Sequence, residues 1–216
     1  QKITPKRAAL VALIEHMDEG IGNVVQTLKD TGAYENTLIV FVSDNGGQRN
    51  VEANNGAIRG AKTEMYEGGI RVPACAVWPG HIQPGQHNDV CSALTMDLFP
   101  TACAVAGVSV DHEIDGVDLS AILQGEKDDL PERTLFWVRR DGGHNHGMAY
   151  YAVRRGDWKL CQGVTPESPF ELFNLADDPG EENPLPKNHP KYRELSKALK
   201  EHIIRSGRVP WQKPVS

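Results

Sequence analysis

Positive charge, long apolar runs and cysteine are all scarce in this sequence of 216 residues. The 23 Lys and Arg residues are outnumbered by 29 Asp and Glu residues, giving a formal net charge of −6, which argues against nucleic-acid binding because that activity favours a basic face. No apolar run approaches the length of a membrane-spanning helix. The first residues also lack the charged segment and apolar core of a secretory signal. We therefore expect neither a nucleic-acid nor a membrane partner.

The few cysteines are widely spaced and form no C-x-x-C pair, which argues against a zinc ribbon or a dense disulfide framework. Their apolar neighbours indicate buried thiols. They are Cys75, Cys91, Cys103 and Cys161. With 39% hydrophobic and 24% charged residues, the rest of the composition is that of a globular protein with room for one sizeable core and a smaller one.

The most informative stretch runs from residue 37 to residue 73. Its apolar run at residues 38–42 predicts a strand buried on both faces, of the kind found in parallel sheets. Asp44 and Asn45 follow where this strand ends, and ligands bind at the carboxyl ends of strands in open α/β sheets. A carboxylate and an amide oxygen before two glycines suit a hard cation such as calcium or magnesium. A tight Asn-Gly turn explains the same residues without a metal, so the spacing alone leaves both interpretations open.

A second block follows at short range, Gly60-Ala61-Lys62-Thr63-Glu64-Met65-Tyr66-Glu67-Gly68-Gly69. Together with the Ser-Asp-Asn-Gly block at residues 43–46, it strongly resembles the sulfatase family, whose fold belongs to the alkaline phosphatase superfamily. The resemblance implies that Asp44 and Asn45 bind a divalent metal, calcium or alternatively magnesium, and that Lys62 contacts the sulfate as a catalytic cation. It further implies a sulfuric ester hydrolase acting on a sulfated carbohydrate or an aryl sulfate, in the periplasm or outside the cell. The particular ester and the oligomeric state stay open.

One sulfatase block is missing. Sulfatases make their nucleophile, formylglycine, from the Cys or Ser of a C/S-x-P/A-x-R block, and the nearest match here, at residues 91–95, has Thr95 in place of the arginine. In the family, this block and two further metal-binding aspartates precede the region corresponding to residue 37, whereas 36 residues precede it here. We therefore expect the chain to correspond to the C-terminal part of a sulfatase, with formylglycine outside it, and to be inactive alone.

Two alternatives to a sulfatase remain. One is a phosphate or phosphonate ester hydrolase of the same superfamily, which shares the metal scaffold. The other is a non-catalytic sulfatase remnant or a carbohydrate-binding module.

Periodicity predicts the elements around the central stretch. Thr4-Pro5 indicates the start of an amphipathic helix that stops at Gly32. Residues 74–78 predict another short buried strand, and residues 92–108 predict a helix that Pro100 would kink. The segments 96–101 and 115–119 resemble sulfatase positions that pack the sheet. The apolar stripe of the first helix consists of Leu10, Ile14, Met17, Ile21, Val24 and Leu28.

The polar, turn-rich residues 125–131 predict a domain boundary. Residues 1–126 are expected to form the C-terminal part of a catalytic α/β domain, a sheet flanked by helices. Residues 127–216 are expected to form a small α+β subdomain, an antiparallel sheet covered by a helix over residues 190–206. The expected strands of this sheet are residues 134–138, 148–153, 158–161 and 170–174.

A glycine-rich loop joins the first two of these strands. Arg140, His144 and His146 in this region are the candidates for contacting a sugar or a sulfate, because recognition residues commonly lie on loops. The two histidines alone lack the further ligands that a zinc site needs. An exposed connection without a binding role is the alternative interpretation.

Overall fold

The structure, a computed structural model, describes residues 3–140 and 148–207. The chain divides into two compact units, which the following paragraphs describe separately: residues 1–43 with 73–131, and residues 44–72 with 132–216. The chain passes from the first unit to the second after residue 131, within the turn-rich segment 125–131. No feature of the sequence predicts that residues 44–72 group with the C-terminal sheet. Domains 1–126 and 127–216 themselves stay a prediction.

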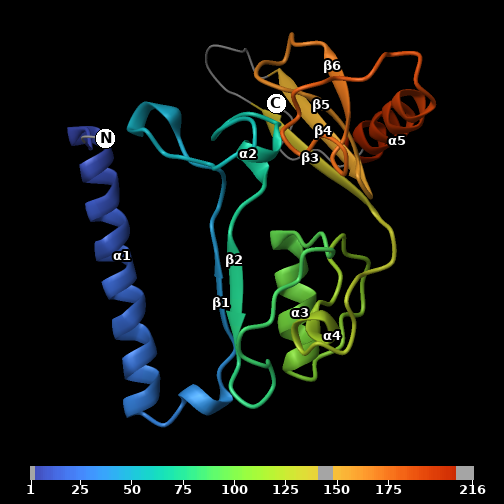
Figure 1. The fold of residues 1–216 in the computed structure, drawn as a ribbon. Helices are drawn as coiled ribbons and strands as arrows, with labels where there is room; N and C mark the ends of the chain where they lie inside the picture. The colour runs from blue at the N-terminus through green and yellow to red at the C-terminus, as the bar shows by residue number, and fades with distance from the viewer. Residues whose placement is uncertain (1–2, 141–147, 208–216) are drawn as a thin grey trace, which may run out of the picture. The chain divides into compact units, whose positions relative to one another are not determined.

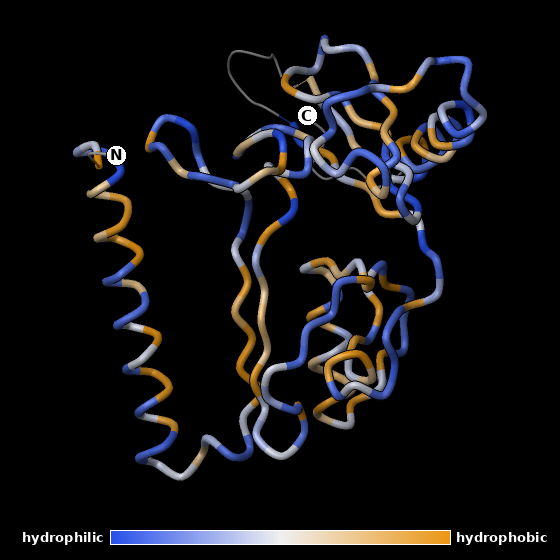
Figure 2. Tube along the Cα trace, in the orientation of Figure 1, coloured by the Kyte–Doolittle hydropathy of each residue, from blue (hydrophilic) through white to orange (hydrophobic). Residues whose placement is uncertain are grey.

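The first unit begins with helix α1, Pro5–Asp30, as predicted (Figure 1). The Thr4 side chain accepts a hydrogen bond from the backbone N–H of Arg7 at 3.1 Å, and Pro5 occupies the first turn. At the other end, Gly32 adopts φ 72°, and the N–H of Ala33 donates to the carbonyl of Leu28 at 2.9 Å. Apolar and polar residues alternate along this helix (Figure 2), yet none of its residues is buried.

Two strands of the first unit depart from the expectation of a parallel, fully buried sheet. Strand β1, Ile39–Val42, pairs antiparallel with β2, Ala74–Val77, so that Ile39 lies opposite Val77. No residue of either strand is buried, and Val40 is 38% exposed. The expectation was wrong because an apolar run does not encode the direction of its partner strand, which depends on the connection between the strands.

The remaining regular elements of this unit are helical. After a short 3-10 turn, Tyr34–Asn36, and the two strands come a second turn, Thr95–Asp97, helix α3, Leu98–Val105, and helix α4, Ser120–Leu123. The helix predicted over residues 92–108 is therefore shorter. Pro100 lies in its first turn, where a missing N–H leaves no helical hydrogen bond unmade, so no kink is required.

Asp97 joins the segments 96–101 and 115–119, for which a structural role was expected. Its fully buried carboxylate accepts from the backbone N–H groups of Leu94 at 2.7 Å and Val117 at 2.9 Å. The N–H of Leu119 in turn donates to the Thr101 hydroxyl at 2.9 Å. These contacts confirm a structural role for both segments.

The C-terminal part of the second unit matches its prediction closely. Four strands form an antiparallel sheet in the order β3-β4-β5-β6, and one helix packs against it (Figure 1). The core between them joins Val153, Leu160 and Leu172 of the sheet to Leu195 and Leu199 of the helix. The elements are β3, Thr134–Arg140, β4, Ala149–Arg155, β5, Trp158–Gln162, β6, Phe170–Asn174, and α5, Pro190–Ser206.

The four cysteines are free thiols, but the expectation that all are buried was wrong. Cys161 on β5 is buried, whereas Cys75 on β2 is exposed because that strand has only one described neighbour and an open face. Within residues 3–140 and 148–207, no helix combines the length and the apolar character needed to cross a bilayer.

Candidate active site

The two sequence blocks at residues 43–47 and 60–69 lie against each other, backbone to backbone. The N–H of Gly46 donates to the carbonyl of Gly69 at 3.0 Å, and the N–H of Lys62 donates to the carbonyl of Gly47 at 3.0 Å. These two bonds hold Lys62 beside the turn that carries Asp44 and Asn45. The structure therefore brings together the two metal-ligand candidates and the candidate cation.

Glycines make this close approach sterically feasible. A Cβ atom on Gly46 would lie 1.7 Å from the carbonyl oxygen of Gly68, and one on Gly68 would lie 2.4 Å from the carbonyl oxygen of Gly60. A Cβ atom on Gly69 would lie 2.1 Å from the carbonyl oxygen of Glu64. Since real Cβ contacts never come so close, the glycines are required by packing between backbone segments.

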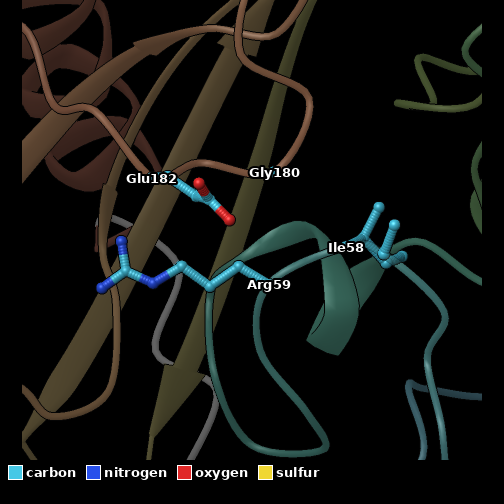
Figure 3. A pocket seen from close by; sticks show the side chains of 5 residues that line it. Ile58, Arg59, Gly180 and Glu182 are labelled. Carbon is cyan, nitrogen blue, oxygen red and sulfur yellow. The ribbon is translucent and has the colours of Figure 1, made fainter.

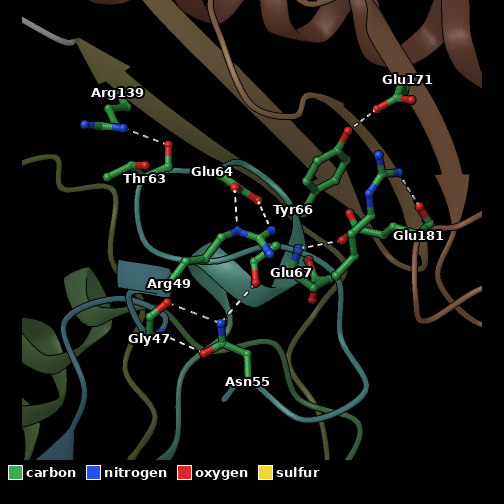
Figure 4. A network of polar contacts seen from close by, with 12 residues as sticks. Gly47, Arg49, Asn55, Thr63, Glu64, Tyr66, Glu67, Arg139, Glu171 and Glu181 are labelled. Carbon is green, nitrogen blue, oxygen red and sulfur yellow. Dashed lines mark hydrogen bonds and ion pairs between the residues drawn. The ribbon is translucent and has the colours of Figure 1, made fainter. Parts of the chain in front are cut away.

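Asn55 clamps the same junction, as Figure 4 shows. Its Oδ1 accepts from the N–H of Gly47 at 2.7 Å, and its Nδ2 donates to the carbonyl of Gly60 at 3.0 Å. Nearby, Arg49, in the short 3-10 turn Arg49–Val51, makes a two-pronged pair with Glu64 at 3.2 and 3.0 Å. These side chains tie the connecting loop to both blocks.

Lys62 is exposed and projects from a strained segment. The next residue, Thr63, adopts φ 84°, a conformation that side-chain-bearing residues rarely take unless their surroundings enforce it. The carbonyl of Thr63 accepts from Nη1 of Arg139, on strand β3, at 2.8 Å (Figure 4). The C-terminal sheet therefore helps to define the backbone around Lys62.

The donor chemistry at Asp44 and Asn45 fits part of a hard-cation site. The Asp44 carboxylate is exposed, and Nδ2 of the half-buried Asn45 donates to the carbonyl of Gly46 at 3.1 Å, which orients the amide. Across the described residues, no group of three or more His, Cys, Asp or Glu side chains gathers as a metal cage would require. These two residues thus fit a shared calcium or magnesium site that needs further ligands.

The remaining recognition candidates are not drawn into this junction. Arg140 is exposed at the end of β3, and it is the preceding Arg139 that contacts the Lys62 segment. His144 and His146 lie outside the described residues. A hollow of about 420 Å³, lined by Arg59 and Glu182 among others (Figure 3), and a second of about 340 Å³ do not include Asp44, Asn45 or Lys62.

A group of buried charges, not expected from the sequence, lies next to the Lys62 segment. Lys159 on β5 is fully buried, and its ammonium lies 2.8 Å from a carboxylate oxygen of Glu67 and 2.8 Å from one of Glu181. Burial works against the Lys159 charge, but these carboxylates outweigh it and raise the pKa of the ammonium. The available signal was a lysine inside an otherwise apolar strand sequence.

Tyr66, in the second block, is also tied to the C-terminal sheet. Its hydroxyl donates to a carboxylate oxygen of Glu171, on β6 (Figure 4). Burial, reinforced by this carboxylate, raises the pKa of the tyrosine well above its usual range. The tyrosine ring packs closely on Gly163, where an added Cβ atom would lie 2.1 Å away.

The sequence of this chain is similar to that of known proteins. A sulfatase family model matches residues 4–108, and a model described as N-sulphoglucosamine sulphohydrolase, C-terminal, matches residues 61–208. Steryl-sulfatase of Mus musculus is 34% identical over 220 residues, which cover 86% of this chain and 35% of that protein.

Solved structures agree. Ps i-CgsB in complex with k-i-k-neocarrahexaose aligns with a TM-score of 0.79 and 30% identity, over 92% of this chain and 43% of that one. BT4656 in complex with its substrate D-glucosamine-2-N,6-O-disulfate aligns with a TM-score of 0.69 and 26% identity, over 93% of this chain and 41% of that one. The chain thus spans about two fifths of the length of these relatives, and it belongs to the sulfatase family.

Proposed function

We propose that this chain supplies one part of the active site of a sulfuric ester hydrolase, whose substrate is a sulfated carbohydrate or an aryl sulfate. The observation that supports the proposal is the backbone junction in which Gly46 bonds to Gly69 and Lys62 bonds to Gly47, because it joins the backbone of Lys62 to the turn that carries Asp44 and Asn45. The disulfated glucosamine bound by BT4656 supports a sulfated sugar as the substrate class.

The roles of the residues follow from their chemistry. Asp44 and Asn45 would hold calcium, with magnesium as the alternative, and the metal when bound would polarise a sulfate oxygen. Lys62 would contact the sulfate and offset the negative charge that develops as the S–O bond breaks, a task suited to a compact ammonium group on a flexible stem. Because no C/S-x-P/A-x-R block is present, we expect the 216-residue chain alone to be inactive.

The test uses the intact protein, meaning the native protein that contains this chain. Hydrolysis of 4-nitrophenyl sulfate and of a 6-O-sulfated glucosamine is compared with hydrolysis of 4-nitrophenyl phosphate. Turnover of the sulfates with little of the phosphate is the expected result. A preference for the phosphate would favour a phosphate ester hydrolase, and no turnover of either class would favour a non-catalytic protein.

Two variants locate the activity on this chain. Lys62→Ala should lower kcat by orders of magnitude without unfolding the protein, since the side chain is exposed. Asp44→Ala should weaken calcium binding measured by isothermal titration calorimetry, a readout that does not depend on turnover. Lys197→Ala is the matched control, because the Lys197 side chain on α5 is 79% exposed. Activity retained in Lys62→Ala would contradict the catalytic role of Lys62.

A further inference from the structure

The buried lysine of strand β5 holds the segment that presents Lys62. Lys159 has no exposed surface, and its Nζ lies 2.8 Å from Glu67 Oε1 and 2.8 Å from Glu181 Oε1. Glu67 is the first residue of the short helix α2, Glu67–Ile70, and stands five positions after Lys62 in the chain. The lysine therefore reaches from the C-terminal sheet directly into the second sulfatase block.

Glu181 completes the attachment from the other side. Its Oε2 accepts from the backbone N–H of Glu67 at 2.6 Å, and its own carbonyl accepts from Nη1 of Arg59 at 2.6 Å (Figure 4). Both the side chain and the backbone of Glu67 are thus bound. The buried triad Lys159, Glu67 and Glu181 therefore holds the segment 59–70 on both sides of Lys62, at Arg59 and at Glu67.

The surroundings of the triad balance its charge. Two carboxylates share the Lys159 ammonium, and the guanidinium of Arg154, on β4, lies 3.6 Å from Glu67 Oε2. The same segment is fixed by the backbone as well, because the N–H of Met65 donates to the carbonyl of Gly163 at 2.8 Å, directly after β5. Each contact joins the Lys62 segment to the sheet strands β4 and β5 or to the loops that follow β5 and β6.

Buried ion pairs are poor stabilisers, because the desolvation of each charge offsets the attraction, and apolar replacements of a whole group are often neutral for stability. Removing one partner is costly, however, since the other charge is left buried and unpaired. Such a triad is therefore suited to selecting one geometry.

We propose that Lys159 is a positioning residue for Lys62, acting through its ion pairs with Glu67 and Glu181. The inference rests on the proposed function, because it assumes that Lys62 faces the sulfate. None of the three triad residues touches the substrate in this scheme. They set the location of the Lys62 ammonium, and a displacement of about 1 Å at a reacting group can cost on the order of a hundredfold in rate.

The test replaces all three charged side chains of the triad, so that none of the three keeps a buried charge without its partner. Arg154 loses its contact with Glu67 but is 22% exposed to solvent. The triple variant Lys159→Met, Glu67→Gln and Glu181→Gln is made in the intact protein. The single variant Glu181→Gln is made as well, because its amide oxygen can still accept a hydrogen bond from the Glu67 N–H. We expect the triple variant to fold, to keep KM for 4-nitrophenyl sulfate within about threefold, and to lose at least about tenfold in kcat. Lys197→Met, at an exposed position of α5, is the matched control.

A second readout does not depend on turnover. Lysines are labelled by reductive methylation with ¹³C-formaldehyde, and the NMR signal of Lys62 is assigned from its absence in Lys62→Arg. The triple variant should shift or broaden this signal while the Lys197 signal stays in place. If the wild-type protein hydrolyses no sulfate ester, the proposed function fails, and the Lys62 signal still tests the positioning role.

Three results would contradict the positioning role of Lys159. Wild-type kcat together with an unchanged Lys62 signal in the folded triple variant overturns the proposal. Unfolding of both the triple variant and Glu181→Gln also overturns it, because the triad would then be required for stability. A kcat loss matched by an equal rise in KM would assign the triad to substrate binding instead.

Discussion

At the scale of single residues, the site depends on close backbone approaches. The turn that carries Asp44 and Asn45 touches the second block through Gly46, whose position leaves no room for a side chain. Asn55 then satisfies the polar groups on both sides of the contact. Gly46 and Asn55 therefore help to set the position of the Lys62 backbone, although neither has a chemical role of its own.

Gly46→Ala should therefore be strongly destabilising. The added Cβ atom would lie 1.7 Å from the carbonyl oxygen of Gly68, so the two blocks must separate, at a cost of about 1–3 kcal/mol or more in the free energy of unfolding. Gly22→Ala is the matched control, because nothing lies within 4 Å of that position in α1 and alanine favours a helix by about 0.5–1 kcal/mol. Denaturation curves of equal midpoint for the two variants would contradict the close contact.

Because the Cys161 thiol is buried, we expect the protein to lose stability at alkaline pH. Burial raises the pKa of its thiol from 9.0 to about 12. The thiol of the unfolded chain ionises first, so its contribution to folding is fully present below pH 9 and is lost as the pH rises toward 12, by up to about 1.4 kcal/mol per pH unit.

The measurement is urea denaturation of the intact protein between pH 8.5 and pH 10. This range stops at the usual pKa of tyrosine, 10.0, above which the raised pKa of Tyr66 adds a loss of the same sign. Cys161→Ala and Cys161→Val should both show a smaller decrease of stability with pH than the wild type. An identical decrease in all three proteins would rule out the thiol as its source.

At the scale of elements, helix α5 packs against one face of the sheet β3 to β6 and forms an apolar core with it. Their apolar positions follow the periods of helix and strand, and the buried residues of each face meet in one cluster. This is the region in which predicted and observed elements agree most closely. The reason is that neighbouring antiparallel strands and one covering helix need only local connections.

Leu199→Ala tests this core. The side chain is 3% exposed and packs against the sheet, so its truncation should lower the free energy of unfolding by about 2–4 kcal/mol. On the same helix, Ile204 is 52% exposed, and Ile204→Ala should cost less than about 1 kcal/mol. The comparison is made by thermal or urea unfolding, and equal effects would mean that α5 does not pack on the sheet as described.

At the scale of the whole chain, the first unit leaves apolar surface uncovered. Helix α1 has no buried residue, and its apolar side chains remain 37–69% exposed at several positions, including Leu13, Ile14 and Val24. Among the described residues, strands β1 and β2 likewise pair only with each other. Exposed apolar faces and open strand edges favour association.

We therefore expect the 216-residue chain, produced alone, to associate or to be poorly soluble. Light scattering coupled to size-exclusion chromatography should give a mass above the 23.7 kDa of one chain. The double variant Ile14→Lys and Val24→Lys should reduce that mass by making the exposed helix face polar. A monomeric, cooperatively unfolding wild-type chain would show that these faces are covered within the chain.

The sequence by itself determined the local features of this protein. The Thr4 cap and Gly32 set the limits of α1, the strand and helix periods predicted the C-terminal sheet and α5, and the two sulfatase blocks named the candidate residues Asp44, Asn45 and Lys62. These features are local because capping, periodicity and turn chemistry depend on residues a few positions apart.

Only the tertiary structure decided the rest. It placed residues 44–72 with the C-terminal sheet, paired β1 antiparallel with β2, left α1 exposed, and buried Lys159 between two carboxylates from distant segments. Glu67 and Lys159 are 92 positions apart in the chain, and no local pattern records which distant charge a buried lysine will meet. That choice follows from how the whole second unit packs, because a buried charge is tolerated only where the fold brings its partner to it.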